Sequence, residues 1–375
     1  MKIFRSILFV INAVLALGLI LTTLAGAVAP SRNILPSLLA FGYVPMLLAN
    51  LVMVLIWGLM GRWELLLSVA AIAVRWGMVP LLMQAGGTSK VPPLDEHPGR
   101  VVVMTYNVHQ FKGNGKDEVK ADSIARRFVD LVRTEAPDVL CMQEDAAVRG
   151  VNVTDSLTNL GYNHFFGART ASTGTPYGTT VFSRFPITYV KRLDAEKVLV
   201  ELLCEGQRLR VVCLHMDSYR FDSDDLEAME RMRHGDVKEY IRPADSTSSK
   251  HDENRRFFAK VKETILTHED EWNETVAPVL DECSTPTLVA GDLNDIPWSW
   301  LYHQLSRRMT DTFTECGTGF STTYRIGADD MPRAPLSFRI DMVFRSEGLR
   351  TLSYKRIKTP LSDHYPVMVA VEFEI

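Results

Sequence analysis

The N-terminal part of the chain contains three long runs of apolar residues with few charges. Ser6–Ala29 holds 24 uncharged residues and Asn33–Gly61 holds 29, whereas a helix of about 20 apolar residues is enough to cross a bilayer. A third run, from residue 65 to about 84, is interrupted by Arg75, which is costly in a membrane unless it is paired or reaches the interface. The pattern therefore predicts two or three transmembrane helices, over about 6–29, 35–60 and 64–84.

A cleaved signal peptide is the alternative explanation of the first run, because the sequence AGAVA at residues 25–29 resembles a cleavage site. The two further runs favour retention of residues 1–85 as an anchor in the bilayer. Lys2 and Arg5 precede the first run and favour a cytoplasmic N-terminus, while Arg32 and Arg62 offset each other across the second run. With three spans the rest of the chain lies outside the cytoplasm, and with two it stays inside. We expect an integral protein of the cell or inner membrane whose larger, polar part is extracytoplasmic.

The pattern changes after residue 85. Residues 86–99 combine Gly, Pro and charges without periodicity and predict a linker, and from residue 100 onward β-branched runs alternate with amphipathic stretches. The segment VKADSIARRFVDLVRTE (119–135), for example, predicts a helix that ends before Pro137, and VLCM (139–142) predicts the strand after it. Strands that alternate with helices, followed by late antiparallel pairs, indicate one α/β domain with mixed sheets over 100–375.

The two parts of the chain also differ in charge. Five of the 41 basic residues and one of the 45 acidic residues lie in 1–85, which leaves a net charge of −8 for 86–375. An acidic domain binds a nucleic-acid backbone poorly by itself, because phosphate binding relies on lysine and arginine, although a divalent cation in the site would weaken this argument. The five cysteines are scattered without a CxxC pair, which argues against a zinc or thioredoxin-type site. Cys204 and Cys213 flank a turn and could face each other across a hairpin.

Polar residues follow five of the predicted strands. They are Asn107 with His109, Glu144, His215, Asp292 with Asn294, and Asp363 with His364. Asp341 lies inside another strand between Ile340 and Met342, where a buried carboxylate needs a partner such as histidine. Each residue has a structural alternative; Asp292–Asp295, for example, could cap a helix that starts near Pro297. In α/β sheets, side chains from separate strand ends converge on one site, and the joint occurrence of these residues favours an active site.

Seven short motifs along this domain resemble those of the endonuclease/exonuclease/phosphatase superfamily, which includes pancreatic-type deoxyribonucleases and neutral sphingomyelinases. In chain order they are TYNVHQF, CMQED, VFSRFPI, CLHMDS, GDLND, RIDMVF and SDHYPV. Each motif alone is weak, but seven in the family's order make the resemblance specific, and it covers about 100–375. It implies an α/β four-layer sandwich of two mixed β-sheets flanked by helices. It also implies Mg²⁺-dependent phosphoester hydrolysis, with Mn²⁺ able to substitute.

Carried over to this chain, the resemblance assigns Glu144 as the principal metal ligand, with Asn107 and Asp363 completing the metal region. Hard oxygen ligands suit Mg²⁺, which keeps several waters and needs few protein carboxylates. Asp292 would orient or activate the attacking water, and Asn294 would hold the scissile phosphate. These roles suit phosphoryl transfer, which needs chiefly charge neutralisation and in-line positioning of a water.

The resemblance also gives roles to the histidines. Asp341 would hydrogen-bond His364, fixing its tautomer and favouring its protonated form, and His364 and His215 would contact phosphoryl oxygens or assist proton transfer. His109 departs from the family, because some relatives carry an acidic residue at this position, and we expect it to contact substrate rather than a second metal ion. The polar stretch at 219–286 matches no motif and is expected to shape substrate access.

These expectations combine into a membrane-tethered, Mg²⁺-dependent phosphoester hydrolase, either a phosphodiesterase or a phosphatase. The tether favours a substrate in the lipid bilayer, such as a head-group or lipid-linked phosphate, because enzyme and substrate are then concentrated at one surface. A membrane-anchored endonuclease or exonuclease on nucleic acid is the second hypothesis, and the net charge of −8 argues against it. A catalytically inactive scaffold is the third, and the presence of every residue that the chemistry needs argues against it.

Overall fold

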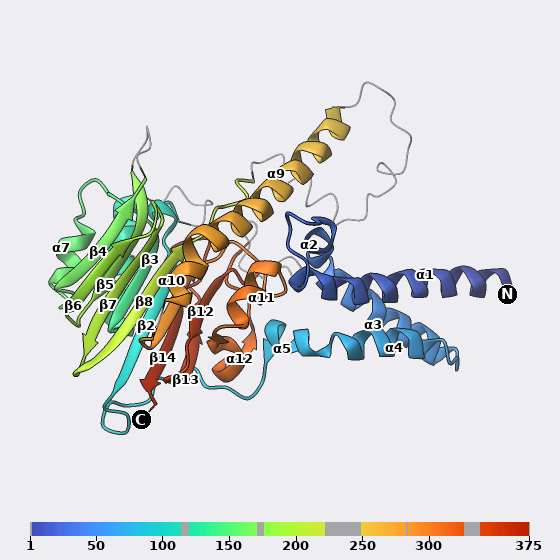
Figure 1. Ribbon diagram of the computed structural model, residues 1–375, viewed down its shortest axis with the longest axis horizontal. Helices are drawn as coiled ribbons and strands as arrows, with labels where there is room; N and C mark the ends of the chain where they lie inside the picture. Colours follow the sequence, from blue (N-terminus) through green and yellow to red (C-terminus); the bar gives the residue numbers. More distant parts are fainter. Residues whose placement is uncertain are drawn as a thin grey trace.

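The computed structural model describes residues 2–113, 120–170, 176–221, 249–282, 284–325 and 338–374, and of 249–254 the backbone only. Residues 222–248 and 283 of the predicted polar stretch therefore lie outside the described residues. Figure 1 shows an α/β domain with two large β-sheets and, extending from one side of it, a group of helices at the N-terminal end of the chain. This group, residues 2–82, corresponds to the predicted membrane anchor and is called the anchor below.

The α/β domain contains two six-stranded sheets. In the first, the strand order is β13 (Leu349–Arg356), β14 (Val367–Phe373), β2 (Arg100–Asn107), β3 (Val139–Ala146), β5 (Tyr177–Ser183), β4 (His164–Arg169). In the second, it is β10 (Thr310–Asp311), β12 (Asp341–Arg345), β9 (Thr287–Asp292), β8 (Gln207–His215), β7 (Lys197–Cys204), β6 (Ile187–Arg192). Among the described strands, β2–β3 and β8–β9 pair in parallel and the other pairs are antiparallel, so both sheets are mixed. A small sheet pairs β1 (Met83–Gln84) with β11 (Gly319–Phe320).

The central strands of each sheet are buried on both faces, which accounts for their long apolar runs in the sequence, whereas the edge strands β4 and β6 are largely exposed. Side chains from both sheets form the core between them, among them Val103, Cys141, Val211 and Ala290. The outer face of the first sheet is covered by α6 (Ala121–Glu135) and α7 (Val153–Thr158). The outer face of the second sheet is covered by α10 (Ala277–Asp281) and α11 (Trp300–Ser306). The predicted four-layer sandwich of two mixed sheets flanked by helices is confirmed.

The remaining helices among the described residues of the domain are η3 (His109–Phe111), α9 (Ser249–Glu271), η5 (Trp272–Val276) and α12 (Thr312–Cys316). The helix predicted before Pro137 is present as α6. It is followed by Ala136 in the left-handed conformation, with φ 47°, which commonly closes a helix. α9 is the longest described helix of the domain and continues through η5 into α10, so it runs from the anchor to the second sheet (Figure 1).

Two structural alternatives drawn from the sequence are wrong. Asp292–Asp295 does not cap the next helix, because α11 starts later and is capped by Ser299, whose hydroxyl accepts from the Tyr302 amide at 3.1 Å. Cys204 and Cys213 do not face each other in the β7–β8 hairpin. Each lies opposite another residue, and both thiols are free.

The anchor consists of long and short helices. They are α1 (Lys2–Leu21), η1 (Thr22–Gly26), α2 (Leu35–Ala40), α3 (Tyr43–Leu59), α4 (Leu65–Val74), η2 (Trp76–Met78) and α5 (Val79–Leu82). Among the described helices, one is long and apolar enough to cross a membrane, namely α1 continued by η1. A second qualifies if α4, η2 and α5 count as one span bent by 52°. With 17 residues, α3 is short for a span, for which about 20 are usual.

Two of the three predicted spans are interrupted. The helix predicted at 35–60 is broken between α2 and α3, since Gly42 precedes α3 and Pro45 in its first turn has no amide hydrogen to donate to α2. The helix predicted at 64–84 bends near Arg75, whose guanidinium lies 5.3 Å from the centre of the Tyr43 ring. The number of membrane crossings stays a prediction.

Polar side chains join the anchor helices from the inside. The Asn12 amide on α1 donates to the Glu64 carbonyl oxygen at 3.1 Å, and the Ser68 hydroxyl on α4 donates to Asn12 at 2.5 Å. Asn50 on α3 donates to a carbonyl oxygen of α1 at 3.0 Å. The carboxylate of Glu64 pairs with Arg5. Polar groups thus face inward, as in transmembrane bundles, while large apolar side chains of α1 and α3 are exposed.

The anchor packs against the α/β domain beside the end of β9. Trp298, in the loop after β9, donates its indole N–H to the Ala40 carbonyl oxygen at 2.7 Å. Ser31 donates through its amide and its hydroxyl to Glu269 on α9, at 2.6 and 2.7 Å. Apolar side chains of α2 and α9 pack together next to these bonds. The anchor therefore forms part of the surroundings of β9 and of the loop that follows it.

Candidate active site

Five strands from both sheets bring polar side chains to one edge of the sandwich. Strand pairing puts His215 of β8 directly beside Asp292 of β9, and Asp292 directly beside Asp341 of β12. The other sheet contributes Asn107 at the end of β2 and Glu144 on β3. The Asn107 amide reaches across to Asp292 at 3.0 Å. The structure therefore assembles residues that lie far apart in the sequence.

A close approach of two backbones fixes the register on which this assembly depends. Gly291 lies opposite Leu214 in the parallel pair of β8 and β9. A Cβ atom at Gly291 would lie only 1.9 Å from the Leu214 carbonyl oxygen, so a larger residue would push the strands apart. Glycine here keeps His215 and Asp292, one residue further along each strand, next to each other.

Asn107 links two carboxylates. Its side-chain nitrogen donates to Glu144 at 3.1 Å and to Asp292 at 3.0 Å, while its oxygen accepts from the His109 amide at 2.9 Å. Gln110 donates a further hydrogen bond to Glu144 at 3.3 Å. Within the described ranges, every ion-pair partner of these two carboxylates is a histidine. The site thus concentrates negative charge that a cation would neutralise.

Four site residues have positive φ angles in the left-handed region, namely His109, Gln110, Glu144 and Asn294. Glu144 has φ 53° at an irregularity of β3, where the pairing with β5 shifts between Met142 and Asp145. β3 therefore continues beyond its predicted end at residue 142, and Glu144 lies at the irregularity rather than after the strand. Asn294 has φ 47° in the loop after β9. Such conformations cost about 1–3 kcal/mol each and cluster at functional sites.

The loop after β9 holds Asp292 in place. The backbone N–H of Asn294 donates to the Asp292 carboxylate at 2.9 Å, and the side-chain amide of Asn294 donates to the Met216 carbonyl oxygen at 2.9 Å. Asp295 in the same loop has other partners: its carboxylate accepts from the next backbone amide at 2.8 Å and lies 3.5 Å from Nδ1 of His268. Of the two aspartates in GDLND, Asp292 is the one that enters the site.

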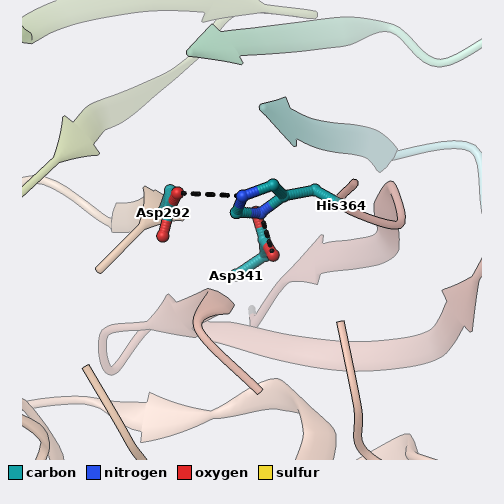
Figure 2. Close-up of side chains that lie close together, drawn as sticks. All are labelled: Asp292, Asp341 and His364. Carbon is teal, nitrogen blue, oxygen red and sulfur yellow. Dashed lines mark hydrogen bonds and ion pairs between the residues drawn. The ribbon is translucent and has the colours of Figure 1, made fainter. Parts of the chain in front are cut away.

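His364 lies between two buried aspartates (Figure 2). Its Nδ1 is 2.9 Å from Asp341 Oδ2 and its Nε2 is 3.7 Å from Asp292 Oδ2, so the predicted bond between Asp341 and His364 is present. The Asp341 backbone amide donates to the Thr323 hydroxyl at 3.0 Å. Burial lowers the pKa of His364, but Asp341 and Asp292 outweigh burial and raise this pKa well above its usual value. His364 therefore holds a proton on the side that faces Asp292.

His215 is the second buried histidine of the site. Its Nε2 lies 3.9 Å from Asp292 and 4.0 Å from Glu144, and its Nδ1 lies 3.6 Å from Glu196. Burial lowers the pKa of His215, but Glu196, Asp292 and Glu144 together raise the pKa to about 9. A charged imidazole at this place can donate a hydrogen bond to an anionic group.

Asp363 and His109 lie at the more open side of the site. Nδ1 of His109 is 3.4 Å from Asp363 and 3.0 Å from the Gly113 carbonyl oxygen. Asp363 is also 4.0 Å from Nε2 of His364, so it belongs to the same group of side chains. His109 lines the cavity of the site, and its contact with substrate stays a prediction.

Two details of local structure differ from the sequence-based expectation. Asp341 is the first residue of β12 rather than a residue in the middle of a strand, although it is fully buried as expected. Asp363 and His364 do not end a strand but precede β14, where the Ser362 hydroxyl donates to the Asn107 carbonyl oxygen at 2.8 Å. The bond from Ser362 ties this segment to the end of β2.

Sequence reasoning missed four residues that support the site. They are Gln110, Glu196, Ser362 and Tyr324. The first and third lie inside the motifs TYNVHQF and SDHYPV, which is a signal that could have identified them. The other two lie outside every motif. Tyr324, whose ring centre is 4.9 Å from that of His364, reaches the site only through the fold.

Among the described residues, one group of side chains brings enough ligand atoms together to hold a divalent cation. Asp292, Asp341 and His364 offer ligand atoms that all lie within 4.8 Å of one another. In this group, however, His364 and Asp341 share a hydrogen bond, and a protonated imidazole is no metal ligand. The carboxylates of Glu144, Asp292 and Asp363 line the same cavity and are the oxygen donors that a hard cation prefers, but their ligand atoms do not all lie within 4.8 Å of one another.

The orientation of Asn107 bears on its predicted role as a ligand. Its nitrogen, not its oxygen, points to Glu144 and Asp292, and its oxygen is occupied by the His109 amide. In this conformation Asn107 positions the two carboxylates. Its assignment as a metal ligand stays a prediction.

The site lies at one end of a cavity of about 880 Å³. Polar residues line that end, namely Asn107, His109, Glu144, Asp292, Asn294, Asp363 and His364. Apolar residues line the rest, among them Leu38 and Phe41 of the anchor region and Phe257, Phe258 and Val261 of α9. The arrangement can bind an anion through protonated histidines and a cation through carboxylates at the same place.

Comparisons with known proteins concern the α/β domain and the N-terminal helices separately. The model of the Endonuclease/Exonuclease/phosphatase family matches residues 104–364, and the model of a domain of unknown function matches residues 5–81. The crystal structure of an endonuclease/exonuclease/phosphatase from Beutenbergia cavernae DSM 12333 is 18% identical, with a TM-score of 0.50 and coverage of 73% of this chain and 72% of its own. This likeness supports the fold. No curated protein matches the chain in sequence.

Two further solved structures resemble the chain less closely. An endonuclease/exonuclease/phosphatase family protein from Leptotrichia buccalis C-1013-b is 15% identical, with a TM-score of 0.47 and coverage of 73% of this chain and 100% of its own. The human Nocturnin catalytic domain with bound sulfate anion is 16% identical, with a TM-score of 0.45 and coverage of 76% of this chain and 100% of its own.

Proposed function

Because the chain belongs to the endonuclease/exonuclease/phosphatase family, we propose that its α/β domain hydrolyses a phosphoester bond with a bound divalent cation, Mg²⁺ or Mn²⁺. One observation carries the proposal. Asp292, a fully buried carboxylate, lies within 4 Å of Asn107, His215 and His364, beside a second carboxylate on Glu144. A carboxylate among protonated histidines is suited to take a proton from a water while the histidines hold the phosphoryl oxygens.

The carboxylates of Glu144, Asp292 and Asp363 are the residues that would hold the cation. When bound, such a cation neutralises charge on phosphoryl oxygens and lowers the pKa of water. Asn107 and Gln110 orient Glu144 through hydrogen bonds at 3.1 and 3.3 Å. This orientation supports Glu144 as the principal ligand.

Side chains of the site would carry out the other two tasks, activation of the attacking water and stabilisation of the developing negative charge. The backbone N–H of Asn294 and the side-chain amide of Asn107 each donate a hydrogen bond to the Asp292 carboxylate. These bonds would hold the carboxylate in position to accept a proton from the attacking water. His364, kept protonated by Asp341, and His215 present N–H groups to the developing negative charge. Such pre-oriented donors stabilise the transition state more than the ground state.

Removal of divalent cations tests the proposal on the full chain purified in dodecyl maltoside. With EDTA, hydrolysis of 4-nitrophenyl phosphate and bis(4-nitrophenyl) phosphate is expected to fall to background and to return with Mg²⁺ or Mn²⁺. At 100 times its Kd the cation stabilises the protein by about 2.7 kcal/mol, which raises Tm by roughly 5–10 °C. The Glu144→Gln variant is expected to lose this rise. Full activity in EDTA, or no hydrolysis of either ester with both metals, would overturn the proposal.

We further propose that the anchor is retained in a membrane. Of the 18 residues in the apolar stretch of α1 and η1, only 22% are buried. The core helix of a soluble protein is mostly buried, so α1 differs from such a helix. Its buried Asn12 bonds to Glu64 and Ser68, and Asn50 bonds back to α1. A signal peptide that is cleaved away has no need of such polar contacts with later helices.

The path of the anchor supports an extracytoplasmic catalytic domain. α1 runs toward the domain, α3 runs away from it, and α4 with α5 returns (Figure 1). The end far from the domain carries Lys2, Arg5 and Arg62, with Arg5 paired to Glu64, whereas the end next to the domain carries Arg32, which offsets Arg62. Positive residues favour the cytoplasmic side, so the domain lies on the opposite side.

Labelling with a membrane-impermeant maleimide in intact cells tests this topology. A cysteine at the exposed linker position (Lys90→Cys) is expected to react in intact cells, whereas a cysteine at the N-terminal end (Lys2→Cys) is expected to react only after permeabilisation. The parent chain, whose described cysteines are buried or half-buried, measures the background. Protection of Lys90→Cys in intact cells would contradict the proposal.

A further inference from the structure

The cavity of the site is far larger than a phosphoryl group requires. Its volume is about 880 Å³, within the range of about 300–1,000 Å³ that holds a drug-sized ligand. The catalytic side chains occupy one end. The other end is lined by Leu38, Phe41, Phe221, Phe257, Phe258 and Val261, which we call the tail pocket. We propose that the tail pocket binds the hydrocarbon chain of a lipid phosphoester whose phosphate lies at the catalytic end. This inference rests on the proposed function and names its substrate class.

The wall of the tail pocket is a continuous series of aromatic rings. The ring centres of Phe41 and Tyr219 are 5.9 Å apart, those of Tyr219 and Phe221 are 5.3 Å apart, and those of Phe221 and Phe257 are 5.3 Å apart. Phe258 follows at 5.6 Å from Phe257. The series joins the anchor to α9 and to the segment after β8. A flexible alkyl chain can lie along such a wall, because apolar contact requires no fixed direction.

The anchor supplies one side of the tail pocket. Leu38 and Phe41 lie at the end of α2 and just after it, in the stretch that leads into α3. The bond from Trp298 to Ala40 holds this stretch against the loop that carries the catalytic aspartate. The same polypeptide segment therefore connects the exposed apolar surface of the anchor with the catalytic cavity. A lipid in the surrounding bilayer would reach the site along this segment.

The exposure of individual side chains distinguishes the rim of the tail pocket from its interior. Phe257 and Val261 are 9% and 6% exposed and form the interior, whereas Phe258 is 51% exposed. A large aromatic side chain that lines a cavity and stays half-exposed has surface left for a ligand to cover. Each buried methylene of an alkyl chain strengthens binding by roughly three- to fourfold.

The charges of the cavity argue against a polyanionic substrate. Among the described residues that line it, the one lysine or arginine is Arg220, and its guanidinium is paired with Asp217 at 2.7 Å. A nucleic acid would bring several phosphates, each needing a positive partner. The described lining thus offers no row of cations for a chain of phosphates, which favours a substrate with a single phosphoester, such as a lipid.

A pair of substrates that differ only in alkyl length tests the tail pocket on the full chain in dodecyl maltoside. For a diesterase the pair is methyl and dodecyl 4-nitrophenyl phosphate, and for a monoesterase it is methyl and dodecyl phosphate. We expect kcat/KM to be at least about 100-fold higher for the dodecyl ester, mainly through a lower KM. Phe258→Ser on α9 and Leu38→Ser in the anchor are each expected to reduce this ratio about tenfold.

Phe165→Ser is the matched control, because Phe165 on β4 is 50% exposed and lies outside the cavity. It is expected to keep the ratio of the parent chain. Equal hydrolysis of the methyl and dodecyl esters would overturn the proposal that the tail pocket binds a hydrocarbon chain, and would leave the proposed function intact. Hydrolysis of neither ester with Mg²⁺ or Mn²⁺ would reject both. Faster cleavage of plasmid DNA than of the dodecyl ester would contradict the lipid as substrate.

Discussion

Replacing Asp292 with asparagine is expected to lower kcat for phosphoester hydrolysis on the order of 1000-fold. The amide keeps the shape of the side chain but cannot accept a proton from water, and it removes one of the charges that would hold the cation. The measurement is release of 4-nitrophenolate by the full chain at saturating Mg²⁺. Tm is expected to fall by several degrees, because the buried, protonated His215 and His364 lose the negative charge that both of them face.

Asp295→Asn is the control for this variant. Asp295 is an aspartate three residues further along the chain, but its carboxylate accepts from the next backbone amide and faces His268 instead of the catalytic end. An asparagine there can still accept the amide hydrogen bond. We expect activity within about threefold of the parent chain. If Asp292→Asn kept most of the activity, or if both variants lost it equally, the catalytic role of Asp292 would be wrong.

Replacing Arg339 with methionine is expected to destabilise the α/β domain by about 3–5 kcal/mol. Arg339 is 2% exposed and forms two bonds with Asp311, at 3.0 and 2.7 Å. Asp311 also accepts from the Tyr302 hydroxyl at 2.8 Å and caps α12 through the Phe313 amide at 3.0 Å. Methionine would leave a buried carboxylate without its cation. Tm, measured by near-ultraviolet circular dichroism, is expected to fall by roughly 6–20 °C.

The matched control removes an arginine–aspartate pair from the surface. Arg133 and Asp130 form an ion pair on α6, and their side chains are 59% and 63% exposed. Arg133→Met is therefore expected to change stability by about 0.5 kcal/mol or less. If Arg339→Met changed Tm as little as Arg133→Met, the prediction that the buried Arg339–Asp311 pair stabilises the α/β domain would be wrong.

The sequence was most informative where chemistry and secondary structure coincide. Asp292 and Asn294 follow a run of buried residues, and the pairing of β9 with β8 and β12 makes that position the centre of the site. The motifs thus predicted both the four-layer fold and the residues that now lie together. A strand-end position can be predicted because it depends on the local alternation of apolar and polar residues.

Features that depend on contacts between distant segments could not be predicted in this way. Nothing next to Glu144 in the sequence indicates its left-handed backbone, which arises from the shift in pairing between β3 and β5. Arg339 lies in the motif RIDMVF, yet only the fold brings it to Asp311. The breaks of the anchor at Gly42 and Arg75 could not be predicted for a different, local reason. A continuous apolar run fits one long helix and two short helices equally well.

The hydrogen bond between Trp298 and Ala40 also affects whether the anchor can be removed or exchanged without disturbing the α/β domain. Trp298 follows Asp292 by only six residues, and the surface that it shares with the anchor includes the apolar side of α9. A fragment that begins in the linker would expose this surface to water and would lack one wall of the cavity. Exchanging the anchor for an unrelated transmembrane helix would have the same effect. The anchor and the α/β domain therefore form one structural unit, and truncation at the linker is expected to remove part of the cavity together with the anchor.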